Sequence, residues 1–156
     1  MINRISTLII TLLLTIVSCK RESNGPSSQE TTLRLELFTS DMEASINFYT
    51  DVLGFTMAGE KPDPSYQVVT KGGVVLGIGP ILKLSPDHYF DPKLKSIQKG
   101  YGTEIVIEVE DIGELYQKVK SNGYPIQSDL KKQNWGLTDF RLIDPDGYYL
   151  RITSKN

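Results

Sequence analysis

The sequence predicts an α+β fold built from two βαβββ modules. Three observations support this fold class. The chain contains an internal repeat, with modules at about residues 32–79 and 103–154 and a linker at 80–102. Each repeat begins with an alternating apolar strand and continues into a segment with helical spacing. Strand-like segments separated by turn residues then complete each repeat.

The first module opens with a strand in which Leu33, Leu35 and Leu37 alternate with polar or aromatic residues. Asp41 follows as a helix N-cap, and apolar residues then recur at helical spacing as far as Gly54, a residue typical of helix ends. Further strands are predicted at about 66–70 and 74–78, with a glycine turn between them.

The second module repeats this pattern. Ile105, Ile107 and Val109 form its alternating strand, Asp111 caps its helix, and Gly123 closes the helix. Three strands are predicted after the helix, at about 127–132, 136–143 and 148–153. The helical segments of the two units have nearly the same length, which indicates one structural unit used twice.

Alternation along these strands defines two faces of each sheet, because successive side chains point to opposite sides. The face that the helix covers is uniformly apolar and carries Leu33, Leu35, Leu37, Ile105, Ile107, Val109, Leu150 and Ile152. The opposite face carries Arg34, Glu36, Phe38, Glu104, Val106, Glu108, Tyr149 and Arg151. In a simple antiparallel sheet such a polar face lies in water. Two sheets that curve toward each other would instead enclose a polar cleft.

The N-terminal segment is predicted to be a signal peptide over residues 1–18. Arg4 provides a basic start, and the apolar run "LIITLLLTIV" is short for a membrane span. The run ends in Ile16-Val17-Ser18-Cys19, which resembles the lipobox of bacterial lipoproteins. That resemblance implies lipidation of Cys19 and export to a bacterial cell membrane, with the domain facing the periplasm or the exterior. Ordinary secretory cleavage near Ser18 is the alternative.

A polar stretch rich in Ser, Gly and Pro then predicts a flexible tether over 19–31, followed by the folded domain at 32–154. Cys19 is the only cysteine, so the domain has neither a disulfide nor a thiolate nucleophile. The formal charge is −2, and no basic run exceeds two residues, as at Lys131-Lys132. We therefore expect no nucleic-acid partner, since phosphate binding needs clustered cations.

Three segments resemble the vicinal oxygen chelate superfamily, which includes glyoxalase I, extradiol dioxygenases and bleomycin-resistance proteins. They are "SDMEASINFYTDVLGF" (40–55), "VEDIGELYQKVKSNGY" (109–124) and "WGLTDFRLIDPDGYYLRI" (135–152). The resemblance covers nearly all of 32–154. It implies curved mixed sheets around a cleft, a small-molecule ligand in that cleft, and a homodimer.

In metalloenzymes of this superfamily, four side chains that face the cleft bind a divalent ion. By resemblance, the corresponding positions here are Arg34, about Gly77, Glu104 and Arg151. Of these, only Glu104 can ligate a cation, because a guanidinium offers only donors and keeps its charge. We therefore expect no metal cofactor. An all-oxygen magnesium or manganese site built on Glu36, Glu104 and Glu108 remains open.

Arg34, Glu104 and Arg151 would place fixed positive side chains where relatives hold a cation. With Glu104 paired to one arginine, the other could bind a carboxylate, phosphate or enolate oxygen of a ligand. The alternative is that these three residues, together with Glu36 and Glu108, only neutralise one another.

Aromatic residues supply the remaining candidates for the binding site. Strand parity places Phe38 and Tyr149 on the cleft face. Trp135 begins the "WGLTDF" strand, a place where the metal-free antibiotic-binding relatives resemble this sequence most. Aromatic walls suit a flat or conjugated ligand, although Trp135 could instead cover a sheet edge. His88-Tyr89-Phe90 in the linker could form a lid or a dimer contact, and a lone loop histidine is more often solvated than a ligand.

The sequence thus predicts a membrane-tethered, metal-free domain that binds a small organic molecule and does not favour an enzyme. The main alternative is a glyoxalase-like lyase or dioxygenase-type enzyme with a displaced metal site. A structural or assembly lipoprotein without a ligand is the third possibility.

Overall fold

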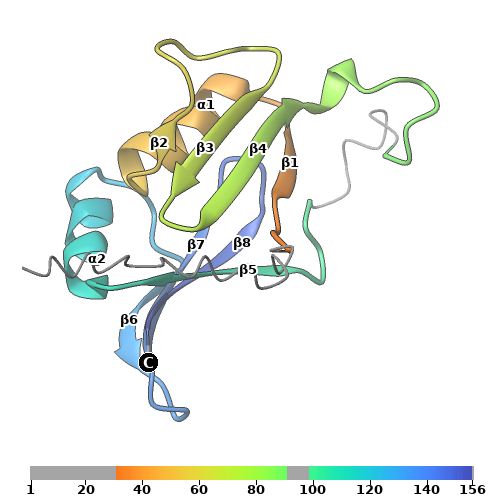
Figure 1. The fold of residues 1–156 in the computed structure, drawn as a ribbon. Coiled ribbons are helices and arrows are strands. Elements are labelled where there is room, and N and C mark those ends of the chain that lie inside the picture. Colours follow the sequence, from red (N-terminus) through yellow and green to blue (C-terminus); the bar gives the residue numbers. More distant parts are fainter. Residues whose placement is uncertain (1–30, 91–98, 156) are drawn as a thin grey trace, which may run out of the picture. The chain divides into compact units, whose positions relative to one another are not determined.

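The computed structural model describes residues 31–90 and 99–155 (Figure 1). The predicted signal peptide, Cys19 and nearly all of the predicted tether lie outside these residues. None of the helices described is both long and apolar enough to cross a membrane. The described chain forms the two predicted modules, each with one helical segment and one four-stranded mixed sheet.

The first module has the strand order β1-β4-β3-β2. Its elements are β1 (Leu35–Thr39), α1 (Met42–Asn47), a π-helical turn η1 (Phe48–Val52), β2 (Thr56–Met57), β3 (Gln67–Lys71), β4 (Val74–Pro80) and a short 3₁₀ turn η2 (Ile81–Lys83). β1 runs parallel to β4, and the other pairs are antiparallel. As predicted, Asp41 caps α1, accepting a hydrogen bond from the Ala44 backbone amide at 3.0 Å.

The second module repeats this topology with the strand order β5-β8-β7-β6. Its elements are β5 (Glu104–Val109), α2 (Ile112–Ser121), β6 (Ser128–Lys132), β7 (Thr138–Ile143) and β8 (Tyr149–Ser154). Asp111 caps α2 by accepting from the Glu114 amide at 2.8 Å. The predicted βαβββ repeat is therefore confirmed, and β1 and β5 each lie at one edge of their own sheet.

The predicted apolar face forms the core. Leu37, Ile107, Leu150 and Ile152 are all buried, together with apolar residues of α1, η1 and α2. Leu33 is an exception, because it is exposed. The strand begins only at Leu35, so the alternation that includes Leu33 extends beyond the sheet.

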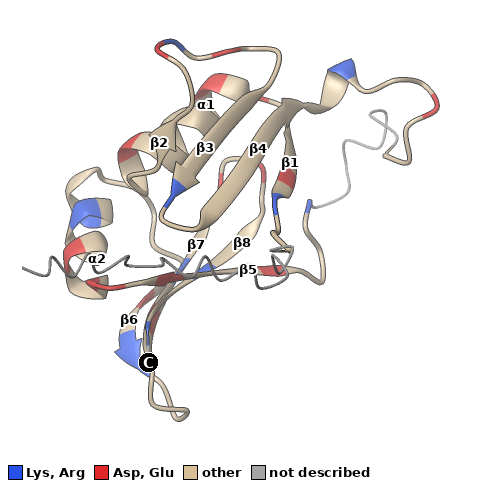
Figure 2. Ribbon diagram, viewed as in Figure 1, with Lys and Arg blue, Asp and Glu red and all other residues tan. Residues whose placement is uncertain are grey.

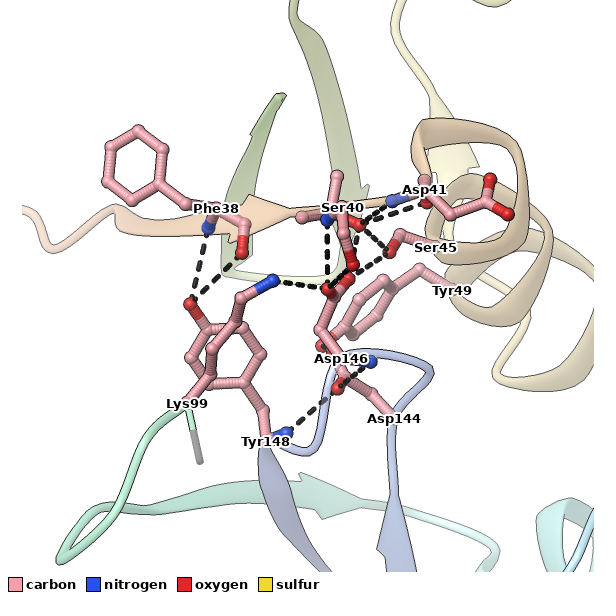
Figure 3. A network of polar contacts seen from close by, with 10 residues as sticks. Phe38, Ser40, Asp41, Ser45, Tyr49, Lys99, Asp144, Asp146 and Tyr148 are labelled. Carbon is pink, nitrogen blue, oxygen red and sulfur yellow. Dashed lines mark hydrogen bonds and ion pairs between the residues drawn. The ribbon is translucent and has the colours of Figure 1, made fainter. Parts of the chain in front are cut away.

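The two modules are joined by polar contacts around Asp146, in the turn between β7 and β8 (Figure 3). Its carboxylate accepts hydrogen bonds from the Ser40 amide at 2.9 Å, the Ser40 hydroxyl at 2.8 Å and the Ser45 hydroxyl at 3.0 Å. It also accepts from the Thr39 hydroxyl and pairs with the Lys99 ammonium. A turn of the second module therefore holds the segment between β1 and α1.

Two tyrosines reinforce this junction. The Tyr148 hydroxyl accepts from the Phe38 amide of β1 at 3.3 Å, and the Tyr49 hydroxyl donates to the buried Asp144 carboxylate at 3.1 Å. Burial raises the pKa of Asp144, an effect opposed by donors that include the Tyr148 and Asp146 amides. Both bonds link the first module to the β7–β8 turn and its flanks.

Candidate binding site on the helix-free sheet faces

Each sheet has a helix-free face, meaning the face opposite its helix, and several of the predicted site residues lie there. On the first sheet, Glu36 lies opposite Gly77 in the β1–β4 pair. The Tyr66 hydroxyl is 2.9 Å from both carboxylate oxygens of Glu36, and Arg34 Nε is 2.6 Å from Glu36 Oε1. Burial and the Glu36 carboxylate raise the pKa of Tyr66, so its hydroxyl stays protonated and donates.

Gly77 makes this arrangement possible. A Cβ at that position would lie within 3.0 Å of both the Glu36 carboxylate and the Tyr66 hydroxyl, closer than real Cβ atoms approach such groups. The position that resemblance assigns to a metal ligand is therefore occupied by a hydrogen-bonded carboxylate and hydroxyl. Any larger side chain at residue 77 must displace them.

An aromatic cluster connects the same strand to the linker. Phe38 contacts the rings of His88 and Phe90, with both centroid distances 5.5 Å, and the rings of His88 and Phe90 are 5.3 Å apart. Tyr89 packs on Phe90 but is otherwise exposed. Part of the linker thus lies over Phe38, which leaves the lid and dimer-contact interpretations of this segment both open.

On the second sheet, register places charged residues in neighbouring rows of the helix-free face. Arg151 of β8 lies opposite Val106 on β5 and Arg141 on β7. In the next rows, Glu104 is opposite Tyr149, and Asp139 is opposite Thr153. The strand pairing therefore brings two arginines side by side between two rows that contain carboxylates.

Three ion pairs connect these residues. Glu104 lies 3.4 Å from both Arg141 Nε and Arg151 Nη2, and Arg141 Nη1 lies 2.9 Å from Asp139 Oδ1. We call Glu104, Asp139, Arg141 and Arg151 the four-charge cluster. Two guanidinium groups and two carboxylates make its formal charge zero. The side chain of Asp139 is 1% exposed, that of Arg141 is 13% and that of Arg151 is 26%.

The four-charge cluster does not satisfy all its own hydrogen bonds. Asp139 Oδ2, Arg141 Nη1 and Arg151 Nε are buried atoms without a hydrogen-bond partner. Arg141 Nη1 and Asp139 Oδ1 are therefore close enough for an ion pair, but the angles between the two groups do not suit a hydrogen bond. The two 3.4 Å separations also exceed the 2.7–2.9 Å typical of charge-assisted bonds. The cluster therefore retains donor capacity.

The structure brings together only some of the predicted site residues. Glu104 and Arg151 are paired, whereas Arg34 pairs with Glu36; within the described residues, no ion pair joins Arg34 to Glu104 or Arg151. Tyr149 is half-buried beside Glu104, with its hydroxyl 3.4 Å from the Gln127 side chain.

Two other predicted residues lie outside these contacts. Glu108 is exposed near the end of β5, and Trp135 is exposed in the turn between β6 and β7. Sequence reasoning missed Arg141, Asp139 and Tyr66. Alternation with the buried Phe140 and Leu142 could have placed Arg141 and Asp139 on the helix-free face.

The residues do not fit a divalent metal ion of the kind that the superfamily's metalloenzymes bind. No group of three or more His, Cys, Asp or Glu side chains able to hold an ion occurs in the part of the chain that the structure describes. At the four positions that the resemblance gives, Gly77 has no side chain, Arg34 and Arg151 are cations, and Glu104 already pairs with two arginines. A bound divalent cation would face repulsion from those arginines.

Comparison with known proteins places this site in a family. Residues 31–152 match the model of the Glyoxalase/Bleomycin resistance protein/Dioxygenase superfamily. The chain is 27% identical over 126 residues to a lactoylglutathione lyase of Neisseria meningitidis, covering 79% of this chain and 89% of that one. It is 26% identical over 129 residues to a lactoylglutathione lyase of Escherichia coli O157:H7, covering 79% and 91%.

Solved structures share the fold at lower identity. TioX from Micromonospora sp. ML1 is 19% identical with a TM-score of 0.61, covering 80% of this chain and 98% of that one. A glyoxalase/bleomycin resistance protein/dioxygenase from Nocardioides is 22% identical with a TM-score of 0.59, covering 81% and 84%. Together with the repeated βαβββ topology, the family match shows that this chain belongs to the Glyoxalase/Bleomycin resistance protein/Dioxygenase superfamily.

Proposed function

We propose that this chain binds a small organic molecule without a metal ion, on the helix-free faces of its sheets. The observation that carries the proposal is the Arg151 guanidinium. It stands at a position that the resemblance assigns to a metal ligand, is 26% exposed, and lies 3.4 Å from its only ion-pair partner in the described residues, Glu104. It can therefore donate to a ligand oxygen without giving up a short bond.

The charge and shape of the surroundings restrict the ligand. Because the four-charge cluster is neutral, it has no surplus positive charge to balance a polyanion. Planar guanidinium groups match a carbonyl, enolate or carboxylate oxygen. The Phe38 ring and its aromatic neighbours suit a flat or conjugated ligand body. We infer a ligand that combines an unsaturated apolar part with one or two oxygen acceptors.

The second candidate is a lyase, because several relatives are named lactoylglutathione lyases. For the superfamily's metalloenzymes, the resemblance implies a divalent ion on cleft-facing ligands, and only Glu104 could serve here. A lyase activity would therefore need either a metal site at other residues or a mechanism that uses no metal. The two candidates differ in one measurable property, which is whether activity and stability depend on an added divalent metal.

We further propose that the domain is exported and anchored to a bacterial cell membrane through a lipidated Cys19, facing the periplasm or the exterior, and that it forms a homodimer. The support is the short apolar run that ends at Cys19 and the polar stretch after it. A tether of that composition would hold the domain away from the bilayer. An assembly role without a ligand would share this anchor but not the requirement for Arg151.

A ligand screen with a matched variant tests the proposed function. Purified protein is screened against flat organic acids, enols and amides by the shift in melting temperature, since binding to the native state stabilises it. Each compound that raises the melting temperature is then titrated into the Arg151→Ala variant and into the Lys61→Ala variant. Lys61→Ala is the control, because it removes a cation from an exposed loop. We expect Arg151→Ala to weaken binding by about 1.5–3 kcal/mol, the range for a charged hydrogen bond. Equal affinity in both variants contradicts the proposed site.

A further inference from the structure

A second polar site lies away from the four-charge cluster, where a groove of about 800 Å³ passes between the two modules. It follows the free edge of β5 and is bounded by the β3–β4 turn on one side and by α2 on the other. Its lining includes Gly54, Lys71 and Lys118 but neither Arg141 nor Arg151. The groove shares Val106 and Glu108 with the helix-free face of the second sheet, but no member of the four-charge cluster lines it.

Two lysines from different modules converge at one end of this groove. Around the position that a Cβ on Gly54 would occupy, Lys118 Nζ lies at 2.9 Å and Lys71 Nζ at 3.5 Å. Gly54 adopts a positive φ of 72° and has no side chain, so both ammonium groups can lie close to its backbone, where a Cβ would crowd Lys118 Nζ. One small anion could contact both groups at once.

Among the described residues, neither lysine forms an ion pair with a carboxylate. Glu114 precedes Lys118 by four residues on α2, a spacing that ordinarily favours an ion pair. The structure nevertheless shows no such pair within 4.0 Å, and within the described ranges Lys71 also lacks one. Lys71 instead donates to the Leu53 carbonyl at the end of the first helical segment. Each ammonium has three donors, so both retain free ones.

The two positive charges also affect each other. Burial and then the Lys118 charge lower the pKa of Lys71, while the Glu114 carboxylate acts in the opposite direction. The two like charges repel each other, and an anion in contact with both would reduce that repulsion. The repulsion between the two ammonium groups thus favours an anionic ligand over a neutral one.

We propose that Lys71 and Lys118 form a binding site for a small free oxyanion of phosphate size. The charges that surround the two lysines limit the size of the anion that can bind. Four carboxylates line the same groove, those of Glu108, Glu110, Asp111 and Glu114, and Lys155 there pairs with Glu110. An extended polyanion or an anionic membrane surface would therefore be repelled. Figure 2 agrees with this, since basic and acidic residues are interspersed over the ribbon without a broad area of one sign.

Inorganic phosphate tests the proposal on the full chain at pH 7. Melting temperature is measured against phosphate and against chloride at equal ionic strength, for wild type, Lys118→Gln, Lys118→Arg and the surface control Lys61→Gln. We expect a saturable rise with phosphate only, weakened about tenfold or more in Lys118→Gln, as loss of one charge-assisted bond implies. Lys118→Arg should retain most of the effect, and Lys61→Gln all of it.

A second readout uses wild type alone, so it does not depend on the folding of a variant. The ammonium NMR signals of Lys71 and Lys118 should shift together with the same apparent affinity as phosphate is added. Equal stabilisation by chloride, an unchanged response in Lys118→Gln, or ammonium signals that do not move would each overturn the site. None of these results bears on ligand binding at Arg151.

Discussion

Asp146 offers a sharp test of how the modules are held together, through the variant Asp146→Asn. Its side chain is 2% exposed and accepts bonds from Lys99, Thr39 and Ser40. Burial alone would raise its pKa, but these donors outweigh burial and lower the pKa from 3.8 to about 2. A pKa difference of this size corresponds to about 2.5 kcal/mol of folding free energy.

The sign of the pH dependence follows from the lowered pKa. The unfolded chain binds a proton at Asp146 more readily than the folded chain does. The carboxylate therefore contributes its full stabilisation at pH values above about 4, and this is lost as the pH falls toward 2. Asp144, whose pKa is raised by burial, acts in the opposite direction, but it is present in wild type and variant alike.

Urea unfolding of wild type and Asp146→Asn at a series of pH values measures the effect. We expect the variant to be less stable by about 2.5 kcal/mol at pH 7, with the difference shrinking as the pH falls from 4 toward 2. Asp87→Asn, in an exposed linker position, should change stability by less than about 0.5 kcal/mol. A difference in stability that is below about 1 kcal/mol, or that does not vary with pH, would contradict the stabilising role of the Asp146 carboxylate.

Three further predictions concern the site and the anchor. Gly77→Ala should destabilise the fold by about 1–3 kcal/mol in thermal or urea unfolding, because the new Cβ displaces the Tyr66 hydroxyl from its bond; unchanged stability would contradict the crowding inferred there. In a double-mutant cycle, Arg151→Ala and Glu104→Gln should be non-additive in unfolding free energy by about 0.5–3 kcal/mol, and additivity would mean that their ion pair contributes nothing. Cys19→Ala should release the protein from membranes or leave it unprocessed; equal fractionation and the same N-terminus as wild type would contradict lipidation.

Much of the fold was predictable because its signals are local. The helix caps, Asp41 and Asp111, depend on neighbouring residues alone, as does the alternation that includes Leu37 and Ile107. Because the pattern is repeated, the prediction for each module also supported the prediction for the other. The π-helical turn at 48–52 and the two-residue strand at 56–57 were not predicted. Both depend on how the chain leaves its helix and meets the sheet, which the apolar spacing does not specify.

The site was predictable only to the level of sheet faces. The alternation of side chains along each strand placed Glu36, Glu104 and Arg151 on the helix-free faces. The residues with which they pair depend on strand register. Arg141 pairs with Glu104 only because β7 lies beside β8, and Tyr66 reaches Glu36 only because Gly77 leaves space. Such contacts arise from residues far apart in the sequence, so local patterns could not identify them.

Metal content is the property that separates metal-free binding from metal-dependent catalysis. Purified protein, incubated with zinc, nickel, iron or manganese and then desalted, is analysed by mass spectrometry for bound metal, and its melting temperature is compared with and without chelator. With Arg34, Gly77 and Arg151 at three of the four ligand positions, we predict far less than one equivalent of metal and no effect of chelator. One equivalent of retained metal together with a fall in melting temperature on chelation would contradict metal-free binding and favour the lyase.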